Sequence, residues 1–414
     1  MKTLITDGPL FDGIKFYDGG SVLFENGKIL SVFDRQVILE DTSQINAGGN
    51  LIMPGLVDLH SDTLERSIEK RKGVFFDVEF AILNLDRQLA ACGITTFYHA
   101  ISFADNELGL RSPQKAENCV RKINAFQSSG QALIRHFIHI RYEVGSEQSF
   151  KIILNLMEQG LVDMVSIMDH TPCQGQFRSM ESYLKFHSDE YDLPSRVIID
   201  RAREKQQNNN QAWQMVKALT ERVTDLKIPL LSHDDDTVEK IDMIKSMGVG
   251  GCEFPVSIEA AIKAREEGLD LFMGSPNLVR NSSSNGNLKA SDLLKEGICA
   301  GLVSDYYPES LLQAGFITET FTANPAKALQ KVTSGPGSFL NSKNKPGFLE
   351  PGADADILIV NRDHKWAHLV AAFAHGHKIF EIQQPLPEYT AESLTMTPTR
   401  DQLKGLCDED RPDQ

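Results

Sequence analysis

The sequence predicts an α/β protein: a (β/α)8 TIM-like barrel with a small β-module formed by the two ends of the chain. Short apolar runs alternate with longer amphipathic stretches through the middle of the chain, as expected for parallel strands covered by helices. Short β-like runs lie on either side of that region. The 414 residues, 41% of them hydrophobic, are enough for one barrel, which takes about 250 residues or more, and one smaller domain.

The barrel is expected to span residues 53–343. Eight apolar runs are expected to form its strands, and the first of these runs begins at residue 52. Residues 179–225 are polar and too long for a single crossover, which predicts one or two extra helices over the barrel rim or a partly disordered stretch. The eight expected strands are residues 52–60, 94–101, 133–143, 162–170, 228–233, 251–256, 269–275 and 300–305.

The β-module is expected to combine residues 1–52 with residues 344–386. The first segment holds short strand-like runs separated by Asp-Gly, Gly-Gly and Asn-Gly turn signals, and the second holds an apolar run at 357–360. We expect the two segments to pair in one small sheet. Residues 387–414 are acidic and have little apolar surface to bury, which predicts a loose tail.

The charge of the chain bears on its partners. A net charge of -15 opposes binding to nucleic acid and to anionic membranes, because all three carry negative charge. The sequence has no signal-peptide run and no apolar stretch of about 18 residues, and its six cysteines include no C-x-x-C pair. We therefore expect a cytoplasmic enzyme acting on a small molecule, with a homo-oligomer left open.

Nearly every expected barrel strand ends in a residue that can bind a metal. The carboxyl ends of barrel strands converge on one face, so residues far apart in the sequence meet there. Imidazole and carboxylate groups gathered in this way hold divalent metals, which lower the pKa of water to about 7. The strand-end residues are His60, Asp62, His139, Glu143, Asp169, His170, His233, Asp234, Glu253 and Asp305.

Two pairs of these residues follow strand alternation. His60 and Asp62 stand two residues apart, so an extended backbone places both on one side, within reach of one ion. The alternative is that Asp62 caps the next helix or orients His60. His139 and Glu143 stand four residues apart, so the same alternation places both on one face, where Glu143 could bridge two metals. The alternative is a structural ion pair between Glu143 and Arg141 or Arg135.

The later strands complete the expected metal site. His170 and His233 are interpreted as ligands, and Asp305 as both a ligand and the general base, the alternative being a cap on a helix that starts at Pro308. Asp234 could lie in the site while Asp235 or Asp236 caps a helix. The expected ion is Zn²⁺, with Mn²⁺ or Mg²⁺ as alternatives. The site is expected to bind one or two such ions. The full expected ligand set is His60, Asp62, Glu143, His170, His233 and Asp305.

A polar loop at residues 277–287 follows the seventh expected strand. Its small polar residues and backbone amides could cradle an anion, or it could be a plain flexible loop. The other histidines, at positions 99, 187, 364, 368, 375 and 377, are not expected to take part in catalysis.

Nine motifs together resemble one known family. Residues 54–60 (PGLVDLH) and 352–357 (GADADI) resemble the two borders of an amidohydrolase-superfamily barrel flanked by a composite β-sandwich. Within those borders, seven blocks in order are similar to the diphosphatases of phosphonate metabolism. The blocks are His60-Ser61-Asp62, residues 139–143 (HIRYE), residues 166–172 (SIMDHTP), residues 232–235 (SHDD), Glu253-Phe254-Pro255, residues 273–280 (MGSPNLVR) and residues 304–308 (SDYYP).

The resemblance implies a substrate and a reaction. Water would attack phosphorus in a 5-triphosphorylated ribosyl alkylphosphonate and release pyrophosphate, as a step of phosphonate catabolism. The resemblance places Arg141, Arg178 and Arg280 on the phosphate chain, with Asn277 and Tyr306 as further substrate contacts. Thr63, His99 and Ser284 differ from the residues that this family leads us to expect.

Two alternatives remain beside this function. The first is an amidohydrolase that acts on a cyclic amide or an N-acyl compound, in which water attacks a carbonyl group. The second is a barrel that has lost catalysis and serves as an interaction scaffold.

Overall fold

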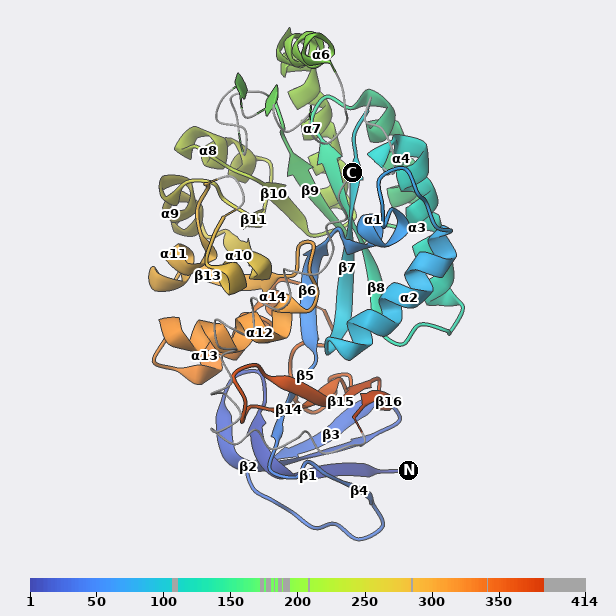
Figure 1. The fold of residues 1–414 in the computed structure, drawn as a ribbon, viewed down its shortest axis with the longest axis vertical. Helices are drawn as coiled ribbons and strands as arrows, with labels where there is room; N and C mark the ends of the chain where they lie inside the picture. The colour runs from blue at the N-terminus through green and yellow to red at the C-terminus, as the bar shows by residue number, and fades with distance from the viewer. Residues whose placement is uncertain are drawn as a thin grey trace, which may run out of the picture.

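The fold is an eight-stranded parallel barrel joined to a smaller, mainly antiparallel sheet (Figure 1). This computed structural model describes residues 1–105, 111–171, 175, 180–181, 183–184, 188, 194–207, 209–283, 286–340 and 342–382. The expected tail at 387–414 lies outside them. Within these ranges, no helix is both long and apolar enough to cross a bilayer. The predicted α/β class, a barrel with a composite β-sandwich, is confirmed.

The barrel strands follow one another around the barrel in chain order, as predicted. Each pairs in parallel with the next, and an isolated bridge between Ser61 and Asp305 brings the first and last strands together. The strands are β6 (Leu56–Ser61), β7 (Ile94–Phe103), β8 (Arg135–Glu143), β9 (Met164–Met168), β10 (Leu230–His233), β11 (Gly251–Glu253), β12 (Asp270–Gly274) and β13 (Cys299–Val303).

Helices surround the barrel and bury its outer face. Two of them lie in the stretch at 179–225, where the sequence predicted extra helices. The helices are α1 (Thr63–Ile68), α2 (Val78–Ala91), α3 (Pro113–Ser128), α4 (Glu147–Glu158), α6 (Ser195–Gln207), α7 (Asn209–Asp225), α8 (Val238–Ser246), α9 (Ile258–Glu266), α10 (Ser275–Arg280), α11 (Ala290–Lys295), α12 (Ser310–Ile317), η2 (Thr318–Phe321), α13 (Pro325–Gln330) and α14 (Ser334–Phe339).

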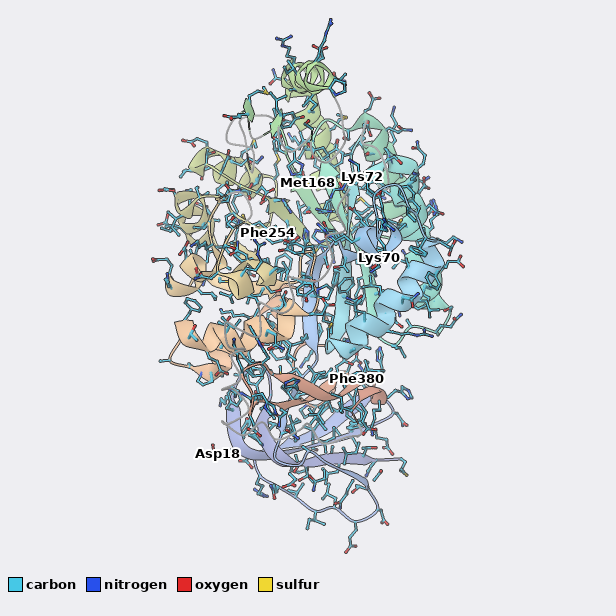
Figure 2. All side chains as sticks on the ribbon, viewed as in Figure 1. Asp18, Lys70, Lys72, Met168, Phe254 and Phe380 are labelled. Carbon is cyan, nitrogen blue, oxygen red and sulfur yellow. The ribbon has the colours of Figure 1, made fainter. Side chains whose placement is uncertain are left out.

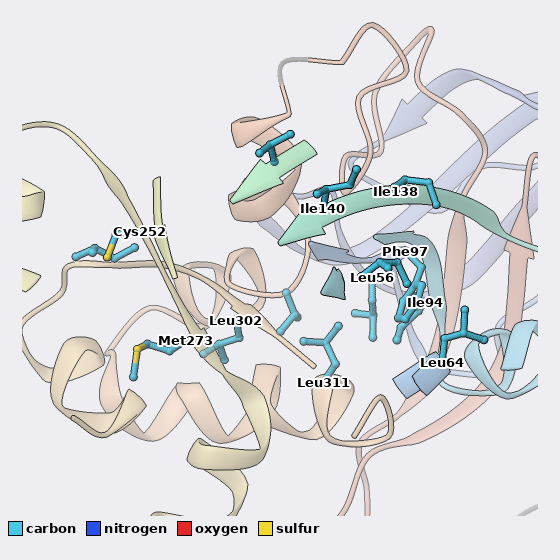
Figure 3. Close-up of a cluster of buried hydrophobic side chains, with 14 of the residues drawn as sticks. Leu56, Leu64, Ile94, Phe97, Ile138, Ile140, Cys252, Met273, Leu302 and Leu311 are labelled. Carbon is cyan, nitrogen blue, oxygen red and sulfur yellow. The ribbon is translucent and has the colours of Figure 1, made fainter. Parts of the chain in front are cut away.

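The main hydrophobic core lies between these strands and helices. Leu56, Ile94 and Ile138 of the strands are buried in one cluster with Leu64 of α1 and Leu311 of α12 (Figure 3). Burying an aliphatic side chain of this size contributes about 1.5–3 kcal/mol. This packing fixes the helices against the barrel and thereby holds the ends of the strands in place.

The smaller sheet is built from both ends of the chain, as predicted. Its β14 strand pairs with β5 in antiparallel register, and Phe24 and Phe373, from opposite ends of the sequence, share its separate core. Figure 1 shows this sandwich below the barrel, with blue and red strands side by side. The strands are β1 (Thr3–Phe11), β2 (Phe16–Glu25), β3 (Lys28–Phe33), β4 (Ser43–Asn46), β5 (Leu51–Pro54), β14 (Ile357–Asn361), β15 (His368–Ala374) and β16 (His377–Glu381).

The first predicted barrel strand, at 52–60, was wrong in one respect: it is two strands that belong to different sheets. Strand β5 joins the sandwich and β6 joins the barrel, with Gly55 between them. A Cβ atom at Gly55 would lie 2.1 Å from the Thr95 hydroxyl oxygen, so only glycine allows this close passage. Both strands are fully buried, and a continuous apolar run does not reveal which sheet each half joins.

Arg135 ties the barrel to the C-terminal border motif. At the start of β8, its guanidinium donates to Asp354 at 2.5 Å, to Asp356 and to the Thr96 hydroxyl at 2.8 Å. All four side chains are buried or nearly so. The sequence allowed an ion pair between Arg135 and Glu143. In the structure, Arg135 instead pairs with Asp354 and Asp356 and so links the barrel to the sandwich.

We predict that Arg135→Met lowers the free energy of unfolding by about 3–5 kcal/mol, because it leaves Asp354 and Asp356 buried without this partner. Scanning calorimetry would measure the effect as a lower Tm. The matched control is Arg121→Met, which removes an exposed i,i+4 pair with Glu117 and should cost less than about 1 kcal/mol. Equal shifts for the two variants would contradict the structural role of Arg135.

Candidate active site

The closure of the barrel brings together two of the predicted site residues. The Asp305 amide donates to the His60 carbonyl at 2.9 Å, and the Asp62 amide donates to the Asp305 carbonyl at 2.8 Å. The Ser61 hydroxyl also donates to the Asp305 carbonyl, at 2.7 Å, and the buried Asp58 carboxylate accepts the Ser304 amide at 3.0 Å. Asp62 and Asp305 are therefore neighbours at the seam between the first and last strands.

Glu253, the last residue of β11, lies between two buried histidines. Its Oε1 atom is 3.0 Å from His60 Nδ1, and its Oε2 atom is 3.7 Å from His139 Nε2. His139 uses Nδ1 to donate to the Leu59 carbonyl at 2.8 Å, which leaves a lone pair on Nε2. Burial lowers the pKa of His60 well below its usual value and that of His139 to about 4. Both imidazoles are therefore neutral and able to bind a metal.

The arrangement around Glu253 fits a divalent cation. His139 Nε2 and Glu253 Oε2 face each other, and neither atom has a hydrogen-bond partner among the described residues. Two buried acceptors in this position repel each other unless a cation lies near both. Neutral imidazoles and a carboxylate are also the donors that Zn²⁺ and similar ions take from proteins.

A second cluster forms around His170 and His233. His170 Nδ1 lies 2.9 Å from Glu143 Oε2, while Asp234 Oδ2 lies 3.6 Å from His170 Nε2 and 2.9 Å from His233 Nδ1. Burial disfavours the charged form of His170, but Glu143 and Asp234 outweigh this effect and raise its pKa to about 9. Burial likewise acts to raise the pKa of Asp234, yet His233 and His170 hold it well below the usual value.

Two groups of described residues have ligand atoms close enough for one ion. They are His60, His233 and Glu253, and His170, His233 and Asp234; within each group the atoms lie within 4.8 Å of one another. Three of the six predicted ligands belong to these groups. Of the other three, Asp62 and Asp305 line the adjacent cavity, and Glu143 contacts His170.

Glu253, Asp234 and His139 were not in the predicted ligand set. Glu253 and Asp234 stand at the ends of strands, whereas His139, expected at a strand end, lies in the middle of β8. Glu253 ends β11 and Asp234 directly follows β10, so their positions at the carboxyl ends of strands were a usable signal. Sequence alternation alone did not show which of the strand-end side chains reach one another across the barrel.

Three residues that follow barrel strands have left-handed backbone. The φ angles are 57° for Asp234, 54° for Phe254 and 57° for Asp305, values that are costly for residues other than glycine. The Phe254 ring packs edge-on against His60 and His233, with ring centroids 5.1 and 5.0 Å away. The strained backbone at Phe254 thus places an apolar wall beside the histidines.

A cavity of about 360 Å³ opens beside these clusters. Met168 and Phe254, which line it, lie in the half of the molecule away from the sandwich residues Asp18 and Phe380 (Figure 2). Nearly all the predicted substrate contacts line the cavity; Arg178 lies outside the described residues. The polar lining includes Asp62, His170, His233, Asp234, Asp305, Arg66, Arg111, Arg141, Arg280, Asn277 and Tyr306.

The capping alternatives for the acidic residues were wrong. Asp62 occupies the N-cap position of α1, but its side chain accepts no capping hydrogen bond. Thr237 caps α8 in place of Asp235 or Asp236. The helix after Asp305 is α12, whose N-cap position is occupied by Glu309.

The predicted loop at 277–287 begins as helix, because α10 extends to Arg280. Ser282, Ser283 and Asn287 of the remaining loop line the cavity, while Ser284 lies outside the described residues.

His99, one of the positions that differ from the family pattern, lies away from the cavity. Its Nε2 atom is 2.9 Å from His136 Nδ1, and His136 Nε2 is 3.0 Å from Asp86 of α2. All three side chains are buried between the barrel and its helices. The polar character of His99 is therefore accommodated within the packing of the barrel.

Comparison with known proteins agrees with this architecture. No family model matches the chain. The chain is 30% identical over 366 residues to alpha-D-ribose 1-methylphosphonate 5-triphosphate diphosphatase of Escherichia coli (strain K12), covering 87% of this chain and 96% of the relative. It is 22% identical to a dihydroorotase of Elusimicrobium minutum, covering 89% and 90%. An amidohydrolase crystal structure superposes with a TM-score of 0.62 and 15% identity, covering 93% and 100%. The chain therefore belongs to the amidohydrolase superfamily and resembles the alpha-D-ribose 1-methylphosphonate 5-triphosphate diphosphatase of Escherichia coli.

Proposed function

We propose that this hydrolase cleaves a phosphoric anhydride and releases pyrophosphate from a 5-triphosphorylated ribosyl alkylphosphonate, as a step of phosphonate catabolism. The observation that carries this proposal is the set of four arginines, Arg66, Arg111, Arg141 and Arg280, that line the cavity beside the candidate metal ligands. The identity to the Escherichia coli diphosphatase supports the same reaction.

The charge of the protein makes these arginines informative. A chain with a net charge of -15 repels a polyphosphate, and the cavity itself contains the carboxylates of Asp62, Asp234 and Asp305. The four guanidinium groups offset the charge of these carboxylates and can form charge-assisted hydrogen bonds with phosphate oxygens. A neutral cyclic amide would have no comparable need for four cations, so the cavity favours an anionic substrate over the amide alternative.

Each group in the cavity has a role in the proposed reaction. His60, His233 and Glu253, or His170, His233 and Asp234, would hold a divalent cation, which would supply Lewis acidity and lower the pKa of water when bound. Asp305 accepts the proton of the attacking water. Burial is the main cause that raises the pKa of Asp305 to about 7, and the negative charge of nearby Asp62 acts in the same direction. The raised pKa strengthens Asp305 as a base. The arginines bind and orient the phosphate chain.

The substrate prediction concerns the purified enzyme and is read out by phosphorus NMR. With a 5-triphosphorylated ribosyl alkylphosphonate, we expect pyrophosphate and the 5-phosphate as products. A dihydropyrimidine and an N-acyl amino acid serve as comparison substrates and should be left intact. Release of orthophosphate alone, or turnover of a comparison substrate in place of the triphosphate, would refute the proposal.

Asp305→Asn should lower kcat by about 10²–10⁴-fold, because the amide cannot accept the proton of water. The backbone contacts of residue 305 are retained, so the Tm should change little. Asp200→Asn, at an exposed position on α6, is the matched control and should keep full activity. A variant at position 305 with wild-type kcat would rule out its role as general base.

Glu253→Gln should weaken metal binding by about 10–100-fold, because it removes a buried negative charge beside His60 and His139. The measurement is metal content by mass spectrometry after dialysis against a chelator, together with the rise in Tm when Zn²⁺ is added back. Glu239→Gln, at an exposed position on α8, should behave as wild type. Unchanged metal content in the Glu253 variant would show that this carboxylate does not support a metal site.

A further inference from the structure

The four cavity arginines are held in two separate pairs. Glu65 of α1 contacts the first pair: its Oε2 atom accepts Arg111 Nε at 3.1 Å, and its Oε1 atom lies 3.8 Å from Arg141 Nη2. A single carboxylate thus lies between two guanidinium groups that come from β8 and from the segment before α3.

Tyr306 contacts the second pair. Its hydroxyl lies 3.1 Å from Arg280 Nη1, and the Arg66 guanidinium lies over its ring, 5.3 Å from the centroid. The ring face attracts the cation by a cation–π interaction, and the hydroxyl oxygen accepts the hydrogen bond. Tyr306 immediately follows Asp305, so the position of this second pair is coupled to the end of β13.

The two pairs differ in depth. The side chains of Arg141 and Arg111 are 8% and 28% exposed, whereas the side chain of Arg66 is 66% exposed and Arg280 is also exposed. We call Arg111 and Arg141 the inner pair and Arg66 and Arg280 the outer pair. A chain of phosphates that enters the cavity toward the metal ligands would meet the outer pair and then the inner pair.

Arg141 carries independent evidence for an anion. Its Nε and Nη2 atoms are buried, and neither has a hydrogen-bond partner in the part of the chain that the structure describes. Buried guanidinium N–H groups without acceptors cost free energy. Because Arg141 lines the cavity, the oxygens of an anionic ligand would offset this cost.

We propose that the two pairs form a two-tier polyphosphate site in which the inner pair binds the phosphate nearest the metal ligands and the outer pair recognises the length of the chain. Glu65 and Tyr306 are its positioning residues, and Arg66 and Arg111 are substrate contacts in addition to Arg141 and Arg280. This inference rests on the proposed function for the identity of the anion, and it specifies how a triphosphate is distinguished from a monophosphate.

The test measures the binding of inorganic orthophosphate, pyrophosphate and tripolyphosphate to the full-length, metal-loaded protein by isothermal titration calorimetry. Wild type should bind tripolyphosphate most tightly. Tyr306→Leu should weaken tripolyphosphate binding by about tenfold and leave orthophosphate binding within about twofold, because only a long anion reaches the outer pair. Glu65→Gln removes the carboxylate that orients both guanidinium groups of the inner pair. Because the inner pair contacts each of the three anions, this variant should bind all three about tenfold more weakly.

A conservative variant and two matched controls complete the design. Tyr306→Phe keeps the ring beneath Arg66 but loses the contact with Arg280, so its affinity for tripolyphosphate should lie between those of wild type and Tyr306→Leu. Glu117→Gln removes a carboxylate that pairs with Arg121 on the surface of α3, and Tyr307→Leu alters the exposed neighbour of Tyr306. Neither control should change any of the three affinities.

Three results would overturn the two-tier site. The first is that wild type binds the three anions with equal affinity, and the second is that Tyr306→Leu weakens the binding of all three equally or not at all. The third is that Glu65→Gln binds the anions as tightly as wild type does. Melting temperature and metal content show whether a variant has lost its fold or its ions. Since this experiment measures anion binding and no turnover, a failure of the two-tier site can be distinguished from a failure of the proposed reaction. A protein that shows the expected binding pattern but releases no pyrophosphate would retain the two-tier site and lose the proposed reaction.

Discussion

The hydrogen bonds between the first and last barrel strands are the constraint on which the site depends. Asp305 bonds through its backbone to His60 and Asp62, and its carbonyl also accepts the Ser61 hydroxyl across a sequence separation of 244 residues. Because the barrel closes at this seam, the carboxyl ends of all eight strands lie around one axis. The histidine and carboxylate clusters and the cavity beside them follow from that closure.

The cavity separates two kinds of chemistry. Buried, neutral imidazoles such as His60 and His139 lie close to the Glu253 carboxylate, which favours a bound cation. The surrounding wall carries arginines, which favour an anion. In a protein with a net charge of -15, this local positive charge would let a polyphosphate approach a site otherwise rich in carboxylates.

The opposite end of the barrel is built for stability. Arg135 links β8 to Asp354 and Asp356 in a buried network, and Gly55 lets the chain pass directly from the sandwich into the barrel beside Thr95. In a barrel of this kind the catalytic groups lie at the carboxyl ends of the strands and the stabilising contacts lie at the amino ends. A change at Arg135 should therefore affect folding, while a change at Asp305 should affect turnover.

The sequence by itself determined the alternation of strands and helices, the order of the barrel strands and the positions of metal-competent residues at strand ends. These features depend on local periodicity and on the rule that parallel strands end on one face, so His60, His170, His233 and Asp305 could be placed together without coordinates. Only the tertiary structure decided that Glu253 contacts His60 and that β5 and β6 belong to different sheets. Contacts across the barrel depend on side-chain reach, which no sequence period encodes. The tertiary structure also placed Arg66 and Arg111 at the cavity. An arginine in or beside a helix is usually a solvated surface residue, so no sequence pattern selects these two.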